Sequence, residues 1–156
     1  MALAGMTQEQ TEKRLRERCE QIAESLEAYA DGTARKCHHC GAVRPIDQYE
    51  ETEHDDAGGT WCICPDCKMK TKKYDLEPVD MYDYLRDALD VSFFVSSKKE
   101  YQGVELLVSC GGPNIYVSTI SRNVELYWGG DRAFFPLRSD VLDALDDWAA
   151  DWWSDL

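Results

Sequence analysis

Two short cysteine motifs decide the fold of the middle of this 156-residue chain: Cys37-His38-His39-Cys40-Gly41 and Cys64-Pro65-Asp66-Cys67. Twenty-three residues separate Cys40 from Cys64. Each Cys-x-x-Cys turn aims two thiolates at one point, so two such turns predict a tetrahedral site of four sulfurs. In a chain without a recognisable secretory signal, this spacing favours metal binding over disulfides. We therefore predict a Zn²⁺ site formed by Cys37, Cys40, Cys64 and Cys67.

The predicted metal is structural, because four thiolates fill a tetrahedral coordination sphere and leave no position for water or substrate. Two alternatives to this ligand set remain open. Cys62 is separated from Cys64 by a single residue, Ile63, and could replace Cys64 as a ligand. Only Cys64, however, has the Cys-x-x-Cys spacing with Cys67. His38 or His39, inside the first motif, could replace one thiolate.

A longer pattern surrounds the two motifs: Cys37-x-x-Cys40-Gly41-x-x-Arg44-Pro45-x-x-x-Tyr49, then Gly58-Gly59-x-Trp61 and the second motif. This pattern, over residues 36–70, resembles a phage-type zinc ribbon. Such ribbons occur alone and at the front of some HNH-type endonucleases of phages and mobile elements. An HNH nuclease needs histidines after the cysteine motifs to hold its metal. The last histidine here is His54, so the resemblance implies a ribbon and no nuclease site.

Charge is distributed unevenly along the chain. The whole sequence has 17 Lys and Arg against 30 Asp and Glu, a net charge of −13. Residues 1–34 carry −3, residues 35–74 are neutral, and residues 75–156 carry −10. A protein that wraps nucleic acid needs a basic face, so we expect no direct nucleic-acid binding. The sequence also lacks the run of about 18 apolar residues that a membrane-spanning helix needs, and we expect a soluble cytoplasmic protein.

Residues 1–34 predict one long helix. Thr7 and Gln10 have the spacing of a capping box, in which each side chain bonds the other residue's backbone N–H. Asp31-Gly32 predicts the helix end. We expect the apolar stripe of this helix to pack on the rest of the same chain, and a homodimeric coiled coil through this helix is the alternative. The stripe consists of Leu15, Cys19, Ile22, Leu26 and Tyr29.

Residues 75–156 predict a small α+β domain. Apolar residues at helical spacing predict a helix over 79–90, and alternation predicts strands near 93–95, 104–110, 115–119, 124–128 and 133–137. Cys110 is expected to face inward, and Ser139 to cap a final helix. The predicted fold class is α+β. It comprises an N-terminal helix (1–34), a four-cysteine zinc ribbon (35–74) and a helix–antiparallel meander–helix domain (75–156).

The final helix has two different faces. Acids recur every fourth residue on one face, and residues 139–156 contain no base. One interpretation is a solvated surface; the other is a partner-binding surface with carboxylates about 6 Å apart along the helix axis. Trp153 could anchor that interface or belong to the core. The stripe expected to face the core is Val141, Leu145, Trp148 and Trp152. The predicted partner-binding residues are Asp140, Asp143, Asp147, Asp151, Trp153 and Asp155.

The sequence carries no recognisable catalytic motif. A cysteine nucleophile needs a neighbouring base, and Cys110 is far in sequence from the three histidines, which all lie in the middle segment. P-loop, dinucleotide-binding, GxSxG and HExxH patterns are also absent. We therefore predict that the protein is not an enzyme.

Two segments of the second half are distinctive: Cys-Gly-Gly-Pro-Asn-x-Tyr at 110–116 and Tyr-Trp-Gly-Gly-Asp at 127–131. With the acidic final helix they resemble small proteins carried by bacterial phages and conjugative elements. The resemblance implies an anti-CRISPR or anti-restriction inhibitor in the bacterial cytoplasm, whose acidic, DNA-mimicking surface occupies the basic surface of a defence effector. The alternative is a nucleic-acid-binding or transcription-type adaptor that contacts DNA or RNA through the ribbon and Lys68, Lys70, Lys72 and Lys73.

Overall fold

The computed structural model describes residues 5–156 and confirms an α+β fold with antiparallel sheets. The first four residues, which bear on the expected absence of a secretory signal, lie outside the described residues. The described chain divides into two compact units. Unit 1 contains residues 81–156 together with the N-terminal segment up to Glu27, and unit 2 contains residues 28–80. This division differs from the three composition segments, because most of the N-terminal helix belongs with the C-terminal half of the chain.

Unit 1 is built on a five-stranded antiparallel meander in the order β11-β10-β9-β8-β7. Its strands are β7 (Asp90–Val95), β8 (Tyr101–Ser109), β9 (Asn114–Ser118), β10 (Asn123–Trp128) and β11 (Asp131–Pro136). Successive residues of a strand point to opposite faces, and apolar residues from the three central strands gather on one face. This core contains Val104, Leu106, Ile115, Val117, Val124 and Leu126, each at most 1% exposed.

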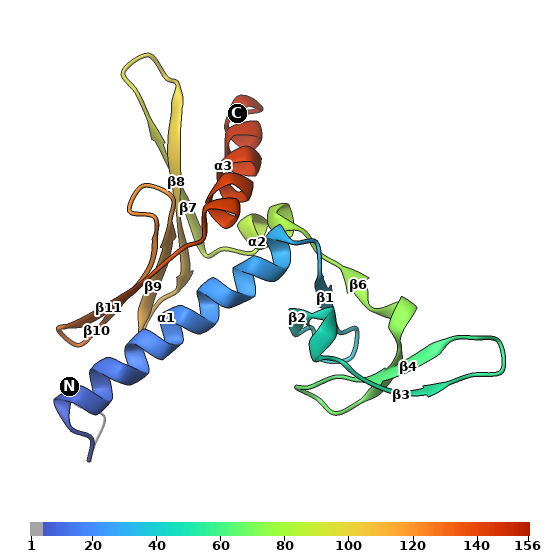
Figure 1. Cartoon of the computed structure of the whole chain (residues 1–156). Helices are drawn as coiled ribbons and strands as arrows, with labels where there is room; N and C mark the ends of the chain where they lie inside the picture. Colours follow the sequence, from blue (N-terminus) through green and yellow to red (C-terminus); the bar gives the residue numbers. More distant parts are fainter. Residues whose placement is uncertain (1–4) are drawn as a thin grey trace. The chain divides into compact units, whose positions relative to one another are not determined.

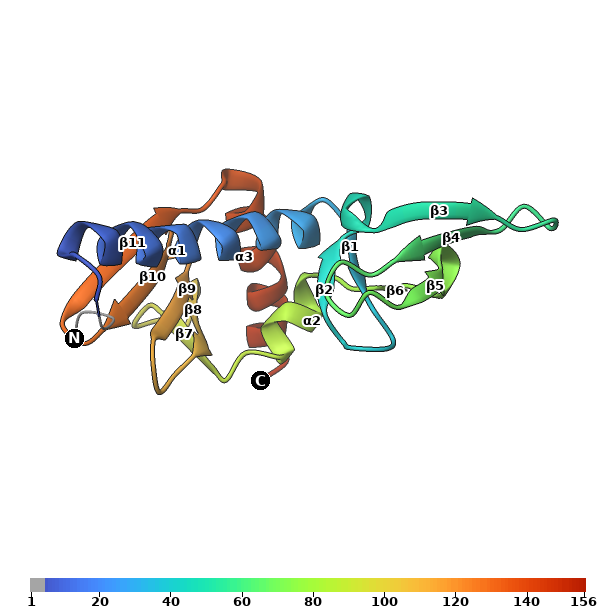
Figure 2. The same cartoon turned by 90° about the horizontal axis from the view of Figure 1, so that it is seen from below.

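Three helices complete unit 1: α1 (Gln8–Ala30), α2 (Met81–Arg86) and α3 (Ser139–Ser154). α3 packs against β8 and α2 (Figure 1). α1 runs alongside β10 and β11 (Figure 2), where the Arg16 guanidinium lies 5.7 Å from the centre of the Phe135 ring. An ion pair of 3.0 Å between Arg138 and Glu27 also ties α1 to the segment before α3.

The capping box of α1 is confirmed. The Thr7 backbone N–H donates to Gln10 Oε1 at 3.0 Å, and the Gln10 N–H donates to Thr7 Oγ1 at 3.2 Å. The helix ends as predicted before Gly32, whose φ of +73° is accessible to glycine without strain. Leu15 and Cys19 of the apolar stripe are buried within the chain, so a second copy would need a different face of this helix.

Four details of unit 1 differ from the sequence expectations. The helix expected over 79–90 is the shorter α2, because the Leu89 N–H already bonds Leu107 O at 2.8 Å as the chain enters β7. The prediction that Ser139 caps α3 is wrong: Arg138 occupies the N-cap position and makes no side-chain capping bond, and Ser139 is the first residue of the helix. The β8–β9 register shifts after Leu107, and Cys110 follows the end of β8 and is exposed. β7 and β11 each begin earlier than expected.

The buried face of α3 also differs from the expected stripe. Val141 and Leu145 are buried as predicted, and Leu142 and Ala149 join them. Trp148 remains 38% exposed and Trp152 is half-buried. Small Ala149 therefore occupies the position nearest the sheet, and the larger indole rings lie at the margin of the core.

Unit 2 contains two three-stranded sheets, in the orders β2-β1-β6 and β3-β4-β5. The first sheet pairs β1 (Ala34–Lys36) with β2 (Val43–Pro45) and with β6 (Glu77–Pro78). The second pairs β4 (Thr60–Ile63) with β3 (Glu50–His54) and β5 (Lys70–Lys72). Short 3₁₀ helices follow β2 (η1, Ile46–Gln48) and β5 (η2, Lys73–Asp75). The unit extends past residue 74 because β6 pairs with β1.

Candidate metal centre

The two cysteine motifs form matching turns at the ends of strands. Cys37 follows β1 and Cys64 follows β4. In the first turn the Gly41 N–H bonds Cys37 O at 2.8 Å, and in the second the Lys68 N–H bonds Cys64 O at 3.0 Å. Gly41 and Lys68 both have positive φ, +74° and +61°, so the same backbone turn is made once with glycine and once with lysine.

The four cysteines converge on one point. Their Sγ atoms all lie within 4.8 Å of one another. The Cys37–Cys67 and Cys40–Cys64 sulfur pairs are 3.9 and 3.8 Å apart. A tetrahedral site with Zn–S bonds of about 2.3 Å has sulfur–sulfur edges of about 3.8 Å. The cysteines can therefore hold a metal ion, and these two of the four cross-motif edges are close to the tetrahedral length.

An apolar layer supports the cysteines from one side. Cys37 and Cys64 are fully buried, together with Tyr49 and Leu76. The Tyr49 hydroxyl donates to the Arg35 backbone oxygen at 3.2 Å. Burial, followed by the negative charge of the neighbouring cysteine thiolates, raises the pKa of Tyr49 well above its ordinary value, so the hydroxyl stays protonated as a donor. The site has two buried ligands, the half-buried Cys67 and the exposed Cys40.

Cys62, His38 and His39 do not belong to the group of four converging cysteines. The buried Cys62 thiol faces the Thr71 backbone oxygen at 3.6 Å, and burial raises its pKa. His38 Nδ1 lies 3.4 Å from Thr71 Oγ1, and the His38 and His39 rings contact each other. Of the alternatives that the sequence left open, the structure thus favours the all-cysteine set with Cys64.

A pair of charged side chains links β2 to the second motif. Arg44 Nε donates to Asp66 Oδ2 at 2.9 Å, and Arg44 Nη2 donates to Asp66 Oδ1 at 2.7 Å. Asp66 lies inside the second motif, and Arg44 lies in β2, three residues after Gly41. This fork of two hydrogen bonds therefore links β2 to the second cysteine turn. The Arg44 hydrogen bond lowers the pKa of Asp66. Arg44 belongs to the ribbon pattern, but its partner could not be identified from spacing.

In the lysine run, the three lysines of β5 and η2 are ion-paired within unit 2, whereas Lys68, which precedes β5, is not. The partners of the three are acids of β3 and the residue after it. Lys70 and Lys72 also lie 5.3 Å from the centre of the Trp61 ring. Lys68 has no ion-pair partner among residues 5–156. The three pairs are Lys70–Glu53, Lys72–Asp55 and Lys73–Glu51.

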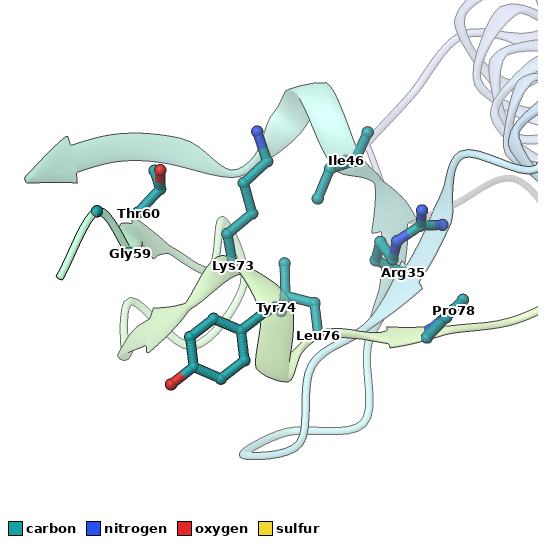
Figure 3. A pocket seen from close by; sticks show the side chains of 9 residues that line it. Arg35, Ile46, Gly59, Thr60, Lys73, Tyr74, Leu76 and Pro78 are labelled. Atoms are coloured by element: carbon teal, nitrogen blue, oxygen red, sulfur yellow. The ribbon is translucent and has the colours of Figure 1, made fainter. Parts of the chain in front are cut away.

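A pocket of about 460 Å³ lies beside this run in unit 2 (Figure 3). Arg35, Lys73 and Tyr74 line it around an apolar patch of Ile46 and Leu76. Both cations already have partners. Arg35 Nη1 donates to the Gly32 and Ala34 carbonyls at 3.0 and 2.8 Å, and Lys73 pairs with Glu51. Lys73 is therefore ion-paired, whereas the Arg35 guanidinium is held by neutral carbonyls and keeps its positive charge beside the pocket.

The predicted partner-binding residues of α3 separate into two groups. Asp140 bonds Arg138 at 2.6 Å, which lowers the pKa of Asp140. Trp153 packs on Phe93 and donates to the Lys99 backbone oxygen at 3.3 Å. These two residues are engaged within unit 1. The other four carboxylates are exposed and have no cationic partner in the described part of the chain, and we call them the acidic face: Asp143, Asp147, Asp151 and Asp155.

An exposed aromatic pair lies next to the acidic face. The Tyr82 ring of α2 and the Trp148 ring of α3 have centroids 5.8 Å apart. Sequence reasoning assigned Trp148 to the core and gave Tyr82 no role. The periodicity of α3 could not identify this pair, because a helical stripe does not show where the neighbouring element ends.

None of the helices in the described residues is long and apolar enough to cross a membrane. Comparison of the chain with protein-family profiles, with curated proteins and with solved structures found no match.

Proposed function

We propose that this chain is a non-enzymatic binding protein that uses a structural zinc ribbon and occupies a basic nucleic-acid-binding surface through the acidic face of α3. The observation that carries the proposal is a contrast between two sets of carboxylates. Glu51, Glu53 and Asp55 pair with lysines of β5 and η2. The acidic face, in contrast, has no cationic partner in the described chain.

Zinc is the proposed metal because of the donor chemistry. Four thiolates in a tetrahedral arrangement favour Zn²⁺, and a closed site of this kind is structural. The ribbon sheets have only three strands each, so a metal would supply stability that so small a core lacks.

A metal analysis tests this assignment. The purified chain should contain one zinc per molecule, and Cys37→Ser or Cys64→Ser should lose it. Cys62→Ser is the matched control, because it removes a buried thiol outside the cluster and should retain the metal. Zinc loss in the Cys62 variant with retention in the Cys64 variant would reassign the ligand.

The acidic face fits a basic partner for electrostatic reasons. Unit 1 contains nineteen acids and ten bases, and unit 2 contains eleven acids and seven bases. Four like charges at successive i,i+4 positions repel one another and disfavour the isolated helix, and acids near the C-terminal end oppose the helix dipole. A partner rich in Lys and Arg relieves both effects when it binds.

The partner class that we propose is an effector of bacterial defence, such as an RNA-guided CRISPR effector or a restriction endonuclease. Such enzymes hold nucleic acid in basic channels, and a row of carboxylates about 6 Å apart competes for the same cations. On this proposal the chain is an inhibitor of a nucleic-acid-targeting enzyme and contacts no nucleic acid itself.

A pull-down tests the proposal. The zinc-loaded chain is immobilised and offered a guide-loaded CRISPR effector or a restriction endonuclease at increasing salt. We expect retention at low salt and release at high salt, because ions screen exposed charges. Substitution of Asp143, Asp147, Asp151 and Asp155 by Asn should abolish retention. Substitution by Gln of four exposed α1 acids, Glu9, Glu12, Glu17 and Glu24, changes the net charge equally and should preserve it. Failure of both enzymes to bind at low salt would contradict the proposal.

The adaptor alternative is addressed by an electrophoretic shift with single- and double-stranded DNA. Three of the four ribbon lysines are ion-paired, so we expect no shift. A shift that disappears when Lys68, Lys70, Lys72 and Lys73 are replaced by Gln would favour the adaptor over the inhibitor.

A further inference from the structure

The aromatic pair formed by Tyr82 and Trp148 is the part of the α2–α3 surface most suited to recognise a specific side chain. The two ring planes are tilted by 49°, and each residue is 38% exposed. Trp152, one turn after Trp148, also contacts Tyr82, with ring centroids 6.3 Å apart. Each residue of the pair is therefore packed against a neighbouring ring and still partly exposed to solvent.

Carboxylates of the acidic face flank the Trp148 ring. Residues three or four apart are neighbours on a helix surface, which places Asp151 beside Trp148 on α3. Asp155 lies two turns further along nearly the same line. A cation that reached the Trp148 ring would therefore also meet at least one carboxylate without a cationic partner in residues 5–156.

The chain already contains one arginine bound in this manner. Arg86 lies over the Tyr82 ring, with its Cζ 5.9 Å from the ring centre, while its Nη2 bonds Asp83 at 3.0 Å. The same guanidinium thus contacts an aromatic ring and a carboxylate three residues away in sequence. Trp148 and Asp151 also supply a ring and a carboxylate, three residues apart on one helix rather than adjacent as Tyr82 and Asp83 are, and no arginine of the described chain lies over the Trp148 ring.

We propose that Trp148 and Asp151, with Tyr82 as a side wall, bind an arginine side chain of the partner. This inference rests on the proposed function and adds the preferred residue to it. A guanidinium is planar and weakly hydrated, stacks on aromatic rings and forms two parallel bonds to a carboxylate. An ammonium group is compact and strongly hydrated, so lysine gains less from the ring. The surface therefore selects arginine-rich segments over lysine-rich segments of equal charge.

The test compares two labelled peptides, nona-arginine and nona-lysine, in fluorescence anisotropy titrations of the zinc-loaded full chain at low salt. We expect the arginine peptide to bind about three- to fivefold more tightly, the size of an exposed cation–π contribution. Trp148→Leu keeps an apolar side chain at the margin of the core but removes the indole face, and should bring the two affinities to within twofold. Trp148→Phe keeps a ring and should retain part of the preference.

Phe134→Ala is the matched control, because Phe134 is an exposed aromatic residue of unit 1 whose surroundings include Lys13, Arg16 and Arg132. It should leave the preference unchanged. Equal binding of both peptides by the wild-type chain, or a preference that survives in Trp148→Leu, would overturn the arginine site and leave the proposed function intact. Failure of both peptides to bind would instead contradict the proposed function. Circular dichroism of each variant establishes that it is folded before titration.

Discussion

At the residue scale, single side chains connect segments that the sequence keeps apart. Arg44 and Asp66 are 22 residues apart, and their two hydrogen bonds connect β2 to the second cysteine turn. Tyr101 of β8 and Asp146 of α3 are 45 residues apart and joined by a bond of 2.6 Å. Cysteine spacing predicted the four ligands, because both pairs lie within local turns. It could not predict these bridges, because their partners meet only through the fold.

Removal of the Arg44 fork should weaken metal binding without removing a ligand. Arg44 bonds Asp66, which lies between Cys64 and Cys67, and both side chains are partly exposed. Exposed ion pairs contribute up to about 1 kcal/mol, so we expect Arg44→Ala to lower zinc affinity by about two- to fivefold, with Arg44→Lys intermediate because lysine cannot make the bidentate contact. Competition with a chromophoric chelator measures the affinity. Arg14→Ala, on the exposed side of α1, is the control, and equal affinity in the Arg44 and Arg14 variants would contradict the role of the fork.

The Tyr101–Asp146 bond should make stability depend on alkaline pH. Burial, followed by the Asp146 hydrogen bond, raises the pKa of Tyr101 above its ordinary value of 10. Above pH 10 the unfolded chain releases this proton before the folded chain does, so the stabilisation is present at neutral pH and is lost as the pH rises toward the folded pKa. We expect Tyr101→Phe to cost about 1–2 kcal/mol at neutral pH and less above pH 10.

Urea denaturation at several pH values measures this difference. Tyr116→Phe is the control, because the Tyr116 hydroxyl makes no hydrogen bond among the described residues. A Tyr101→Phe effect that stays constant from pH 7 to above pH 10 would show that the hydroxyl proton is not linked to folding.

At the element scale, local signals predicted where α1 begins and the antiparallel meander, whereas tertiary contacts set the remaining boundaries. The capping box of α1 needs only residues three apart, so the sequence shows it directly. α2 ends earlier than its apolar pattern indicates because the β7–β8 ladder already includes the Leu89 N–H. In α3, Ala149 faces the core where Trp148 was expected. The spacing of apolar residues along a helix does not show whether a bulky or a small one of them fits against the sheet.

The acidic face of α3 should lower stability and increase binding. Asp147 lies four residues from both Asp143 and Asp151, so Asp147→Lys replaces two repulsions by two attractions. We expect the free energy of unfolding to rise by about 0.5–1 kcal/mol in urea denaturation, together with reduced retention on the basic partner. Asp87→Lys, an exposed acid outside α3, changes charge equally and is the control. Unimpaired retention in the Asp147 variant would mean that this face is only a solvated surface.

At the scale of the whole molecule, two units of different construction share one chain. Unit 1 has a five-stranded sheet with a fully buried apolar core, whereas unit 2 has two small sheets assembled around the cysteine cluster. Composition separated the neutral ribbon from the acidic half, but it could not show that α1 belongs with residues 81–156 or that β6 returns to β1. Both relations depend on packing between segments that are distant in sequence.

Metal removal should therefore affect the two units differently. A strong chelator should unfold residues 28–80, because zinc binding supplies about 10–16 kcal/mol in small zinc-binding peptides. The sheet of unit 1 should remain folded on its own core. Backbone amide NMR spectra with and without chelator separate these outcomes, with the Leu106 and Val117 signals reporting unit 1. An unchanged spectrum of unit 2 would contradict a structural metal.

The central claim, that the acidic face occupies a nucleic-acid-binding surface, is tested most directly by displacement of DNA. Labelled target DNA is bound to a guide-loaded CRISPR effector or to a restriction endonuclease, and its anisotropy is followed as the zinc-loaded chain is added at low salt. The account predicts that the wild-type chain and the fourfold α1 Glu→Gln variant release the DNA, and that the fourfold α3 Asp→Asn variant does not. DNA that stays bound to both enzymes in the presence of excess wild-type chain would contradict the claim.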